Sequence, residues 1–535
     1  MAGRRVAPRL QARVSVAMPE ETNVGESADR RSPRVLVFVV AYEAESTLSR
    51  VLERIPPSIW ALDTEVLVID DSSRDRTFEV GLLTAERVGH PVTVLYNSSN
   101  QGYGGNQKLG YAYALRYGFD FVVLIHGDGQ YAPESIPDLL RPLLDGTSDA
   151  VFGSRMLVAG AARRGGMPLY KYAGNKILTW FQNRMLGARL SEFHSGFRAY
   201  RVSALGALPF ERNSNVFHFD TEIIIQFLMA GFRVSEVPIP TYYGDEICRV
   251  DGIKYAKDVA LATVGSRLHR LNVLYDRKYD VDSSVNRRYS LKLGYSSSHT
   301  AALAAVPDGS RVLDIGCGPG DFARELLKKR CNVDGADQVP PVEPSPFGTF
   351  ITWKEPETLA VDLRRYDVVL LLDIIEHLRE PEPFLDALRA AARSHQPKII
   401  VTTGNVTFFV VRFQALLGHF NYGRRGILDL THSRLFTFKT LRTLFEQCGF
   451  RVERVGGIPA PFPLALGDGR LGRALVTLNT FLIRLSRGLF SYQIFLVASP
   501  LPTVDALLDD AVAGSAARAD AVRQGRPVVR TQEPA

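Results

Sequence analysis

The chain alternates short, nearly apolar runs with polar segments whose apolar residues recur at helical spacing. The first such runs span residues 35–41, 65–69 and 121–125, and β-branched residues dominate them. Runs of this length without polar alternation are typical of strands buried on both faces, as in parallel sheets covered by helices. An amphipathic stretch over residues 46–54 follows the first run. The pattern therefore predicts repeated strand-loop-helix units and an α/β fold.

A second series of apolar runs occupies the C-terminal half of the chain. The first of them, residues 310–315, leads into a Gly-rich loop and a helix expected over residues 321–329. Later strands are expected over residues 332–336, 366–372, 398–401, 452–455 and 493–497, the last two as terminal antiparallel strands. Strands that alternate with helical patterns again predict a largely parallel sheet.

Composition places the boundaries between the two series. At 535 residues the chain is too long for one ordinary domain. Residues 276–297 are rich in Ser, Asn and Arg, which is typical of a linker. We therefore expect one domain over residues 33–275 and a second over residues 298–500. Residues 1–32 and 501–535 are expected to be disordered tails.

Charge and hydropathy narrow the partners and the compartment. The net charge of +7 suits polyanionic ligands or an anionic membrane surface. We expect no nucleic acid, because neither zinc-finger spacing nor a sustained basic helix is present. The four cysteines form no CxxC pair, and no uninterrupted apolar stretch of about 18 residues occurs. We expect a cytoplasmic protein that can also bind peripherally at the inner face of the membrane. The helix predicted over residues 255–273 either packs on its domain or lies on the membrane surface.

Acidic or Gly-rich loops follow three expected strands of the first series. Asp128, between Gly127 and Gly129, follows residues 121–125, at the strand end where parallel sheets bind ligands. A carboxylate there suits a divalent cation shared with nucleotide phosphates, although Gly-Asp-Gly is also ordinary turn chemistry. Asp70 and Asp71 can accept hydrogen bonds from a base and ribose. An acid there can also cap the next helix, and both roles can hold at once. The Gly-rich residues 97–106 are a candidate phosphate loop.

In this order the motifs resemble those of family 2 glycosyltransferases of the GT-A fold, the group that includes polyprenyl-phosphate sugar transferases. The resemblance covers residues 34–250. It rests on Val40-Ala41-Tyr42, residues 70–77, His126-Gly127-Asp128-Gly129-Gln130, and residues 152–155, 192–198, 219–222 and 237–244. The family's metal motif is Asp-x-Asp, and His126 occupies its first position here. Asp128 is therefore the expected direct metal ligand.

The resemblance implies inverting transfer of a sugar from a nucleotide-sugar donor, with Mg²⁺ or Mn²⁺ as the divalent metal. The expected donor-binding residues are Ala41, Tyr42, Glu45, Asp70, Asp71, Gly127 and Arg249, the last with a solvated helix face as its alternative. Glu192 occupies the position of the family's acceptor-side acid and is the candidate general base for a hydroxyl acceptor. A polyprenyl phosphate acceptor is already ionised and needs little help. We expect a lipid phosphate or a lipid-linked glycan over a soluble glycan.

A second organising loop is the run Asp314-x-Gly316-x-Gly318-x-Gly320, between an expected strand and an expected helix. Its glycines let a ligand approach the backbone, and by itself the loop fits either a dinucleotide or S-adenosyl-L-methionine. Asp337 ends the next expected strand, where an acid accepts hydrogen bonds from ribose hydroxyls.

Together with residues 366–378, which run from a strand through Asp373 into Glu-His-Leu, these segments resemble a class I S-adenosylmethionine-dependent methyltransferase. The resemblance covers about residues 298–500. It implies S-adenosyl-L-methionine as the methyl donor, bound by Asp314, Gly316, Gly318, Gly320, Asp337 and Asp373. His432, in a polar loop, is a candidate base, with an oriented structural histidine as the alternative.

The sequence thus predicts an α/β protein in which a GT-A nucleotide-diphospho-sugar transferase domain precedes a Rossmann-like class I methyltransferase domain. We expect a bifunctional enzyme of glycan or glycolipid biosynthesis. In the alternative, one domain, the C-terminal one in particular, is catalytically silent and serves as a ligand-sensing or scaffolding module.

Overall fold

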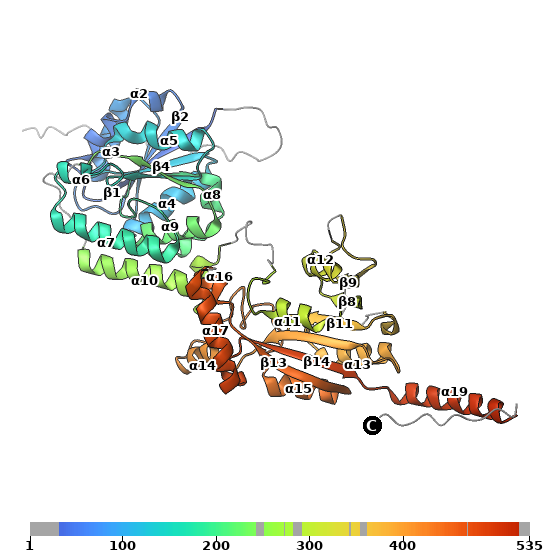
Figure 1. The fold of residues 1–535 in the computed structure, drawn as a ribbon. Coiled ribbons are helices and arrows are strands. Elements are labelled where there is room, and N and C mark those ends of the chain that lie inside the picture. The colour runs from blue at the N-terminus through green and yellow to red at the C-terminus, as the bar shows by residue number, and fades with distance from the viewer. Residues whose placement is uncertain are drawn as a thin grey trace, which may run out of the picture. The chain divides into compact units, whose positions relative to one another are not determined.

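The computed structural model describes residues 32–241, 251–271, 273–281, 291–341, 344–353, 361–467 and 469–523. The chain forms two compact units, the first comprising Met1–Arg267 and Asp276–Arg287 and the second Leu268–Tyr275 and Arg288–Ala535. Each unit contains one seven-stranded sheet (Figure 1). The predicted α/β class with two domains is confirmed.

The sheet of the first unit has the strand order β3-β2-β1-β4-β6-β5-β7. Its strands are β1 (Arg34–Ala41), β2 (Asp63–Asp70), β3 (Val92–Tyr96), β4 (Phe121–His126), β5 (Ala150–Ser154), β6 (Arg198–Arg201) and β7 (Val234–Pro238). β3, β2, β1 and β4 are mutually parallel, and β6 runs antiparallel to both β4 and β5. The parallel arrangement brings the carboxyl ends of β1, β2 and β4 to one edge.

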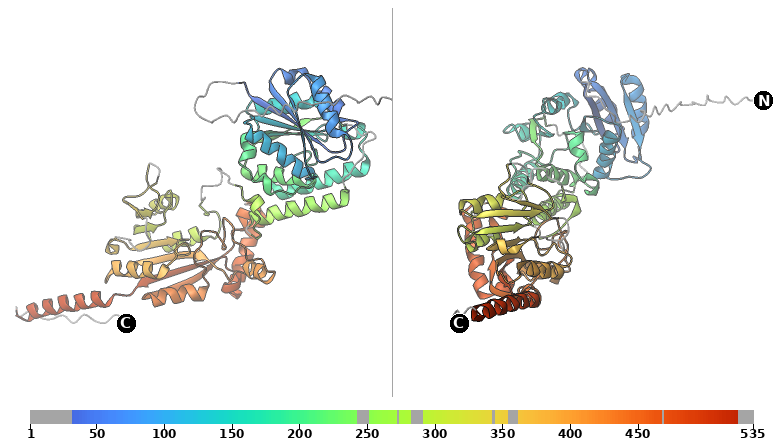
Figure 2. Two further views of the ribbon diagram at one scale, coloured as in Figure 1. Left: turned by 180° about the vertical axis from the view of Figure 1, so that it is seen from behind. Right: turned by 90° about the vertical axis from the view of Figure 1, so that its right-hand side faces the viewer.

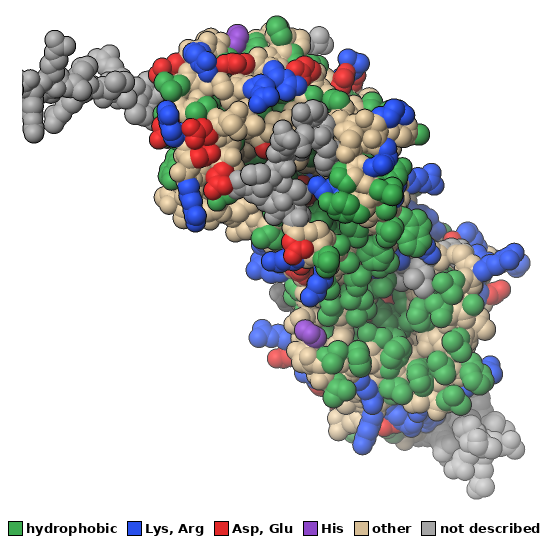
Figure 3. All heavy atoms as spheres, turned by 90° about the vertical axis from the view of Figure 1, so that its left-hand side faces the viewer, with side chains coloured by type: hydrophobic (Ala, Val, Ile, Leu, Met, Phe, Trp, Pro, Cys, Tyr) green, Lys and Arg blue, Asp and Glu red, His purple; other side chains and the backbone are tan. Residues whose placement is uncertain are grey.

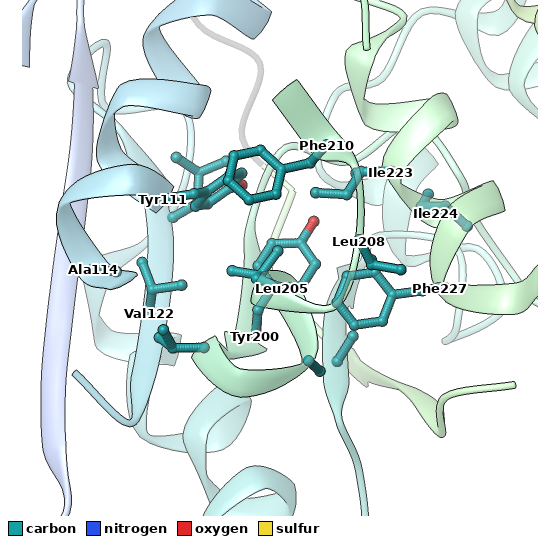
Figure 4. Close-up of a cluster of buried hydrophobic side chains, with 14 of the residues drawn as sticks. Tyr111, Ala114, Val122, Tyr200, Leu205, Leu208, Phe210, Ile223, Ile224 and Phe227 are labelled. Carbon is teal, nitrogen blue, oxygen red and sulfur yellow. The ribbon is translucent and has the colours of Figure 1, made fainter. Parts of the chain in front are cut away.

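Helices cover both faces of this sheet (Figure 2). They are α1 (Leu48–Glu53), α2 (Pro57–Trp60), α3 (Thr77–Val88), α4 (Tyr103–Arg116), α5 (Ile136–Leu144), α6 (Ala161–Arg164), α7 (Leu169–Leu186), α8 (Val202–Gly206), α9 (Phe219–Ala230) and α10 (Gly252–Arg270), with 3₁₀ turns at Pro133–Ser135, Phe210–Arg212 and Arg277–Tyr279. Alternate residues of β1 point to opposite faces: Val37 packs with α1 and α5, and Phe38 with α4 and α9. Figure 4 shows the second cluster, where Tyr111 of α4 contacts Tyr200 and Phe210, and Phe227 stacks on Tyr200.

The sheet of the second unit has the order β10-β9-β8-β11-β12-β14-β13. Its strands are β8 (Arg311–Ile315), β9 (Asn332–Asp337), β10 (Phe350–Thr352), β11 (Val368–Leu372), β12 (Lys398–Gly404), β13 (Phe450–Ile458) and β14 (Gln493–Pro500). Five strands are parallel, and β14 runs antiparallel to its neighbours β12 and β13. The strand order reverses between β8 and β11, the position at which doubly wound sheets bind ligands.

Two helical layers enclose this second sheet as well. The helices are α11 (Ser298–Ala305), α12 (Asp321–Lys328), α13 (Pro381–Ala392), α14 (Phe409–Leu416), α15 (Phe438–Gln447), α16 (Phe462–Leu466), α17 (Arg470–Leu485), α18 (Arg487–Phe490) and α19 (Val504–Arg523), with a 3₁₀ turn at Leu363–Arg365. Residues of α13 and α15 pack on one face and residues of α11 and α12 on the other. No helix in the described ranges is long and apolar enough to cross a bilayer.

The structure differs from the expected boundaries at three places. Leu268–Tyr275, expected in the first domain, belongs to the second unit. Tyr279, placed in the linker by composition, is buried in the core of the first unit and donates a hydrogen bond to Ala262 O, because its ring fills space beneath α10. Residues 504–523, expected to belong to a disordered tail, form α19 instead. Ala506 is buried and Asp510 accepts a hydrogen bond from Ser394, so the helix is tied to its unit.

Two helices also differ from their predicted form. α4 begins at Tyr103, so the last four residues of the Gly-rich stretch, 103–106, form its first turn, and residues 97–102 are the loop before it. A Cβ at Gly104 would lie 2.5 Å from Ser214 O, so glycine is required for close packing there. α10 spans Gly252–Arg270, whereas the sequence predicted residues 255–273. Its buried residues are Val259, Ala262, Thr263 and Ser266, and Leu261 is exposed.

Candidate functional site

The predicted donor-binding residues of the first unit meet at one edge of its sheet. Asp71 N donates to Ala41 O at 2.9 Å, and Gly127 N donates to Val40 O at the same distance. The Thr47 hydroxyl donates to Gly127 O at 2.7 Å. The ends of β1, β2 and β4 are therefore held together, as the parallel pairing requires.

Asp70 is buried at the end of β2 with half of its carboxylate engaged. Its Oδ1 accepts hydrogen bonds from the backbone N and the hydroxyl of Ser73, at 3.1 and 2.5 Å. Its Oδ2 is buried and has no partner among the described groups. Burial raises the pKa of this carboxyl, and the hydrogen bonds of Ser73 oppose that rise. A buried acceptor without a donor is costly, so the site is suited to a ligand N–H or hydroxyl.

Asp71 organises the loop that precedes α4. Its Oδ1 accepts from Asn97 Nδ2 and from Gln101 N, both at 2.8 Å, and its Oδ2 accepts from Gly102 N at 2.9 Å. Its carboxylate thus fixes residues 97–102 and does not cap α3. The capping alternative for Asp71 does not hold, because the loop from β3 supplies the nearer donors.

The loops after β1 and β2 are joined to each other by polar contacts. Glu43 N donates to the Ser73 hydroxyl at 2.8 Å, and Arg76 N donates to Glu45 Oε2 at 3.1 Å. Glu43 and Ser72 have φ of 48° and 62°, the left-handed region that costs energy for residues with a side chain. Such strain persists only where surrounding contacts hold it, and it is enriched at ligand sites.

Asp128 and His126 form a pair facing outward from the end of β4. The Asp128 side chain is 49% exposed, and its Oδ1 accepts from Gln130 N at 3.0 Å. Gly129 has φ of 76°, which explains the glycine after the acid. His126 Nδ1 lies 4.0 Å from Asp128 Oδ2.

The hydrogen bonds of Tyr103 determine which nitrogen of His126 carries the proton. The Tyr103 hydroxyl donates to Asp220 Oδ2 at 2.9 Å and lies 3.0 Å from His126 Nε2. Because the Tyr103 proton goes to the carboxylate, Nε2 of His126 is the donor and its Nδ1 keeps a lone pair. Burial lowers the pKa of His126, against the opposing field of Asp128, so the ring is neutral near pH 7. The lone pair on Nδ1 is directed to the side of Asp128.

Asp220 and Arg198 hold Tyr103 and His126 in this arrangement, since Asp220 accepts from Tyr103 and lies beside Arg198. The sequence motifs assigned neither residue a role. Asp220 also accepts from Gln107 Nε2 at 3.1 Å and lies 3.5 Å from Arg198 Nη2. Arg198 is fully buried and donates to Ser195 O at 2.7 Å and to Phe193 O at 3.0 Å. Both residues stand inside the quoted motifs, but Tyr103 carried no signal, because its role depends on contacts distant in sequence.

Glu192 is fully buried and its carboxylate is fully engaged. It accepts from Arg155 N at 2.8 Å, Arg155 Nε at 3.0 Å and Asn175 Nδ2 at 2.8 Å, and it pairs with Arg155 Nη2. Burial by itself raises the pKa of Glu192, but the charge and hydrogen bonds of Arg155 outweigh it and lower the pKa. An ionised, enclosed carboxylate that lies in an ion pair is suited to holding Arg155 in place, not to exchanging protons with substrate. Arg249, the remaining predicted donor residue, lies outside the described residues.

The Gly-rich loop of the second unit forms a tight turn between β8 and α12. Gly316, Gly318 and Gly320 have φ of 77°, 53° and 82°. A Cβ at Gly316 would lie 2.0 Å from Ile374 Cδ1, whereas one at Gly318 would meet nothing within 4 Å. Gly318 is therefore open to a ligand, and Gly316 is needed for the loop to pack.

Two acids flank this loop. Asp314 is buried at the end of β8, and burial, followed by the charge of Asp337, raises its pKa to about 7. Asp337 Oδ2 accepts from Gly318 N at 2.8 Å, and its Oδ1 accepts from Gln338 N at 2.7 Å. Asp337 thus orders the glycine loop from the end of β9, and its expected contact with ribose hydroxyls stays a prediction.

Asp373 and Glu376 follow β11 on the other side of the strand-order reversal. Asp373 has φ of 56°, and its Oδ1 accepts from the Thr402 hydroxyl and from Gln493 Nε2, each at 2.8 Å. Glu376 is buried, its Oε2 has no partner among the described groups, and burial, then Asp373, raises its pKa to about 8. A neutral Glu376 is a hydrogen-bond donor at the floor of this site. Gln493 was not predicted, since it reaches Asp373 from a strand distant in sequence.

His432 lies in a loop anchored to the same region. Ser433 N and Arg434 N donate to Glu376 O at 2.8 and 3.0 Å. His432 Nδ1 is 2.9 Å from Ile427 O, and because a carbonyl only accepts, Nδ1 carries the proton and Nε2 keeps the lone pair. The ring of His377 contacts it edge-on, with 4.8 Å between centroids. Burial lowers the pKa of His432.

No group of three or more His, Cys, Asp or Glu side chains in the described ranges is placed to hold a metal ion. Any metal at Asp128 therefore needs ligand oxygens from the donor.

Comparisons with known proteins cover both units. The glycosyl transferase family 2 pattern matches residues 36–208, and a methyltransferase domain pattern matches residues 287–455. An undecaprenyl-phosphate mannosyltransferase from Micrococcus luteus is 32% identical over 38% of this chain and 82% of its own length. A polyprenol monophosphomannose synthase from Mycolicibacterium smegmatis is 28% identical over 42% of this chain and 84% of its own.

Among solved structures, a glucosyl-3-phosphoglycerate synthase from Mycobacterium tuberculosis is 20% identical, covers 43% of this chain and 79% of its own, and has a TM-score of 0.32. The family 2 match includes the carboxyl ends of β1, β2 and β4, and the methyltransferase match includes the glycine loop. The chain is therefore an enzyme that belongs to glycosyl transferase family 2 and carries a methyltransferase domain after its glycosyltransferase domain.

Proposed function

We propose that the first unit transfers a sugar, with inversion, from a nucleoside-diphosphate sugar to a polyprenyl phosphate, and that the second unit methylates a hydroxyl of a lipid-linked glycan with S-adenosyl-L-methionine. The relatives that match the first unit include an undecaprenyl-phosphate mannosyltransferase and a polyprenol monophosphomannose synthase. The observation that carries the proposal is the state of Glu192, whose carboxylate is closed off by Arg155 and Asn175.

The donor side fits a nucleoside diphosphate. The buried Oδ2 of Asp70 offers an acceptor to a base N–H or a ribose hydroxyl. Tyr42 directly follows Ala41, the strand partner of Asp70, and offers an exposed ring for stacking. The exposed carboxylate of Asp128 and Nδ1 of His126 offer one oxygen and one nitrogen to a divalent cation. Such a cation, when bound, neutralises the charge that develops on the leaving diphosphate.

The acceptor side fits a nucleophile that is ionised on arrival. A hydroxyl acceptor needs a base within hydrogen-bond reach, and the expected base, Glu192, is buried in an ion pair. A phosphate monoester oxygen needs no proton removal and is attracted by a cation. Glu192 then acts by positioning Arg155, which also donates to His194 O at 3.1 Å, on the acceptor side of the site.

The surface beside the acceptor side suits a lipid. α7 turns Asn175 inward to Glu192 and exposes Tyr170, Ile177 and Trp180 on its other side, next to Lys176. Aromatic and basic residues on one exposed face are typical of a helix that lies in a membrane interface. This supports peripheral contact with the membrane that carries the acceptor.

The methyl-donor side fits S-adenosyl-L-methionine. The glycine loop leaves space above Gly318, and Asp337 stands beside it to accept from ribose hydroxyls. When bound, the donor supplies an electrophilic methyl group. His432 Nε2 is the base that takes the proton of the attacking hydroxyl, while Ile427 O holds the ring in the required tautomer.

The test of the acceptor class is transfer from a panel of radiolabelled nucleotide sugars. Polyprenyl phosphate in vesicles, the matching polyprenol without phosphate, and soluble saccharides are compared as acceptors. We expect label in the lipid only when the phosphate is present. Transfer to saccharides alone would overturn the proposal.

The same assay with Glu192→Gln separates positioning from base catalysis. Loss of the charge loosens Arg155, so we expect a higher KM for the lipid phosphate and a lower unfolding temperature, with the pH profile of kcat unchanged in shape. Asp138→Asn, an exposed acid on α5, is the matched control. If Glu192→Gln instead removes an ionisation from the pH profile and lowers kcat by roughly 10² to 10⁴-fold, Glu192 is a base and the acceptor is a hydroxyl.

A further inference from the structure

We propose that α14 and α17 of the second unit form a docking surface for an anionic lipid bilayer. The role of this surface rests on the proposed function, in which the second unit methylates a lipid-linked glycan. Docking would bring that substrate to the methyltransferase site. The test of the docking surface does not depend on either activity.

α17 exposes an apolar stripe away from its own domain. Leu471, Leu478, Phe481 and Leu485 are 62, 52, 56 and 69% exposed and recur at spacings that place them on one side of the helix. The residues that pack inward, Val476 and Asn479 among them, occupy another side. Hydrophobic side chains gather on the face of the molecule that carries this helix (Figure 3). The stripe is therefore not needed to fold the unit.

α14 adds a second stripe of the same kind. Phe413, Leu416 and Leu417 are exposed at helical spacing. The ring of Phe409, at the start of α14, lies 6.0 Å from that of Phe490 in α18, which continues directly from α17. The two helices thus belong to one contiguous region of the unit, and neither stripe has a partner among the described residues.

The charge around the stripes identifies the occupant. Residues 405–428 contain Arg412, Arg424 and Arg425 and no acid, and residues 458–491 contain four arginines and a single acid, Asp468. Apolar stripes edged by arginines complement the interface of a bilayer with anionic headgroups. A second copy of the chain is disfavoured as the occupant, because a two-fold interface would place the arginines of one copy opposite those of the other.

The position of the helices suits delivery to the methyl-transfer site. α14 follows β12, whose Thr402 binds Asp373, and α17 and α18 precede β14, whose Gln493 binds the same carboxylate. Both strands therefore connect the proposed docking surface to the residues beneath the donor. A lipid-linked glycan held at the bilayer would reach the site along these elements.

The test is co-sedimentation of the full chain with vesicles of phosphatidylcholine, with and without phosphatidylglycerol. Leu478→Ser with Phe481→Ser should weaken binding to anionic vesicles by at least about tenfold, since two apolar side chains no longer enter the interface. Arg470→Glu with Arg484→Glu should abolish the preference for anionic over neutral vesicles. The control is Leu507→Ser with Leu508→Ser, two exposed leucines on the acidic helix α19 of the same unit, and it should bind as the parent chain does.

Other occupants give distinct results. If binding is lost only with Ile177→Ser and Trp180→Ser on α7, the bilayer contacts the first unit alone and the inference is overturned, while the proposed acceptor class stands. A dimer that Leu478→Ser with Phe481→Ser dissociates, seen by light scattering, would assign the surface to a second copy. An environment-sensitive dye on Phe481→Cys should shift to the blue only when anionic vesicles are added; a blue signal without vesicles would mean that the chain covers the stripe itself.

Discussion

At the scale of single residues, Tyr103 determines what His126 can do. Its hydroxyl donates to Asp220 and so requires a proton on Nε2 of His126. The first position of the family's acidic motif is therefore filled by a neutral imidazole with its lone pair on Nδ1, and not by a second carboxylate. Asp128 is left as the single negative charge of that motif, and the effect of removing it can be isolated.

Asp128→Asn should lower sugar transfer by at least about 10²-fold, because the variant loses the charge that holds a divalent cation against the diphosphate. The fold should be unchanged, since Asn also accepts the hydrogen bond from Gln130 N and the side chain is half exposed. Isothermal titration of nucleotide with and without Mn²⁺ checks this: metal should raise nucleotide affinity in the parent chain only. S-adenosyl-L-methionine binding should stay as in the parent. Full transfer by the variant would exclude Asp128 from the mechanism.

At the scale of elements, the loop between β8 and α12 carries glycines with two different purposes. Gly316 has no room for a side chain within the protein, whereas Gly318 faces open space. Substitution at Gly316 would confound folding with binding. Gly318 is therefore the position at which ligand binding can be tested by itself.

Gly318→Ala should weaken S-adenosyl-L-methionine binding by about tenfold or more, because the new methyl group enters the space left for the donor. Gly309→Ala is the matched control: it has φ of 76°, meets nothing within 4 Å and lies before β8, so it carries a similar backbone strain without facing the loop. Both variants should lose similar stability in thermal unfolding, and only Gly318→Ala should lose affinity in titration. Equal affinity in both would remove the loop from the donor site.

At the scale of the whole molecule, two sheets with separate cores make two folding units, each with its own response to pH. In the second unit, burial raises the pKa of Glu376 to about 8 and that of Asp314 to about 7. Between the ordinary pKa of each carboxyl and its raised pKa in the folded chain, the folded state keeps a proton that the unfolded chain has lost. Stability of this unit should consequently fall as pH rises from about 5 to 8.

Glu376→Gln should remove part of that dependence, because the amide stays neutral at every pH. The variant should unfold at the parent's temperature near pH 5 and several degrees higher near pH 8, at roughly 2 to 4 °C for each kcal/mol. Calorimetry of the full chain measures this, with the transition of the second unit identified by its shift on adding S-adenosyl-L-methionine. Glu446→Gln, an exposed acid on α15, should change neither temperature. An equal shift at both pH values would show that Glu376 is ionised in the folded chain.

The sequence by itself determined the two α/β domains, their central strands and the acidic and Gly-rich loops that follow those strands. These features are local: buried strands need apolar runs, and tight loops at strand ends need glycine and acids. Asp128, Asp70 and the glycines of residues 316–320 were placed at or just after strand ends in this way. The sequence also placed Asp337 and Asp373 at strand ends, because the strands themselves were recognised.

Only the tertiary structure decided how these residues are paired. Glu192 was expected as a base, and the enclosure by Arg155 and Asn175 that argues against that role joins segments far apart in the chain. The tautomer of His126 depends on Tyr103 and Asp220. Asp373 accepts a hydrogen bond from Gln493, which lies far from it in the sequence. The exposed stripe of α17 has the same periodicity as a buried one. Which side chains meet, and which face remains open, depends on how the elements pack, and packing is not encoded in any one segment.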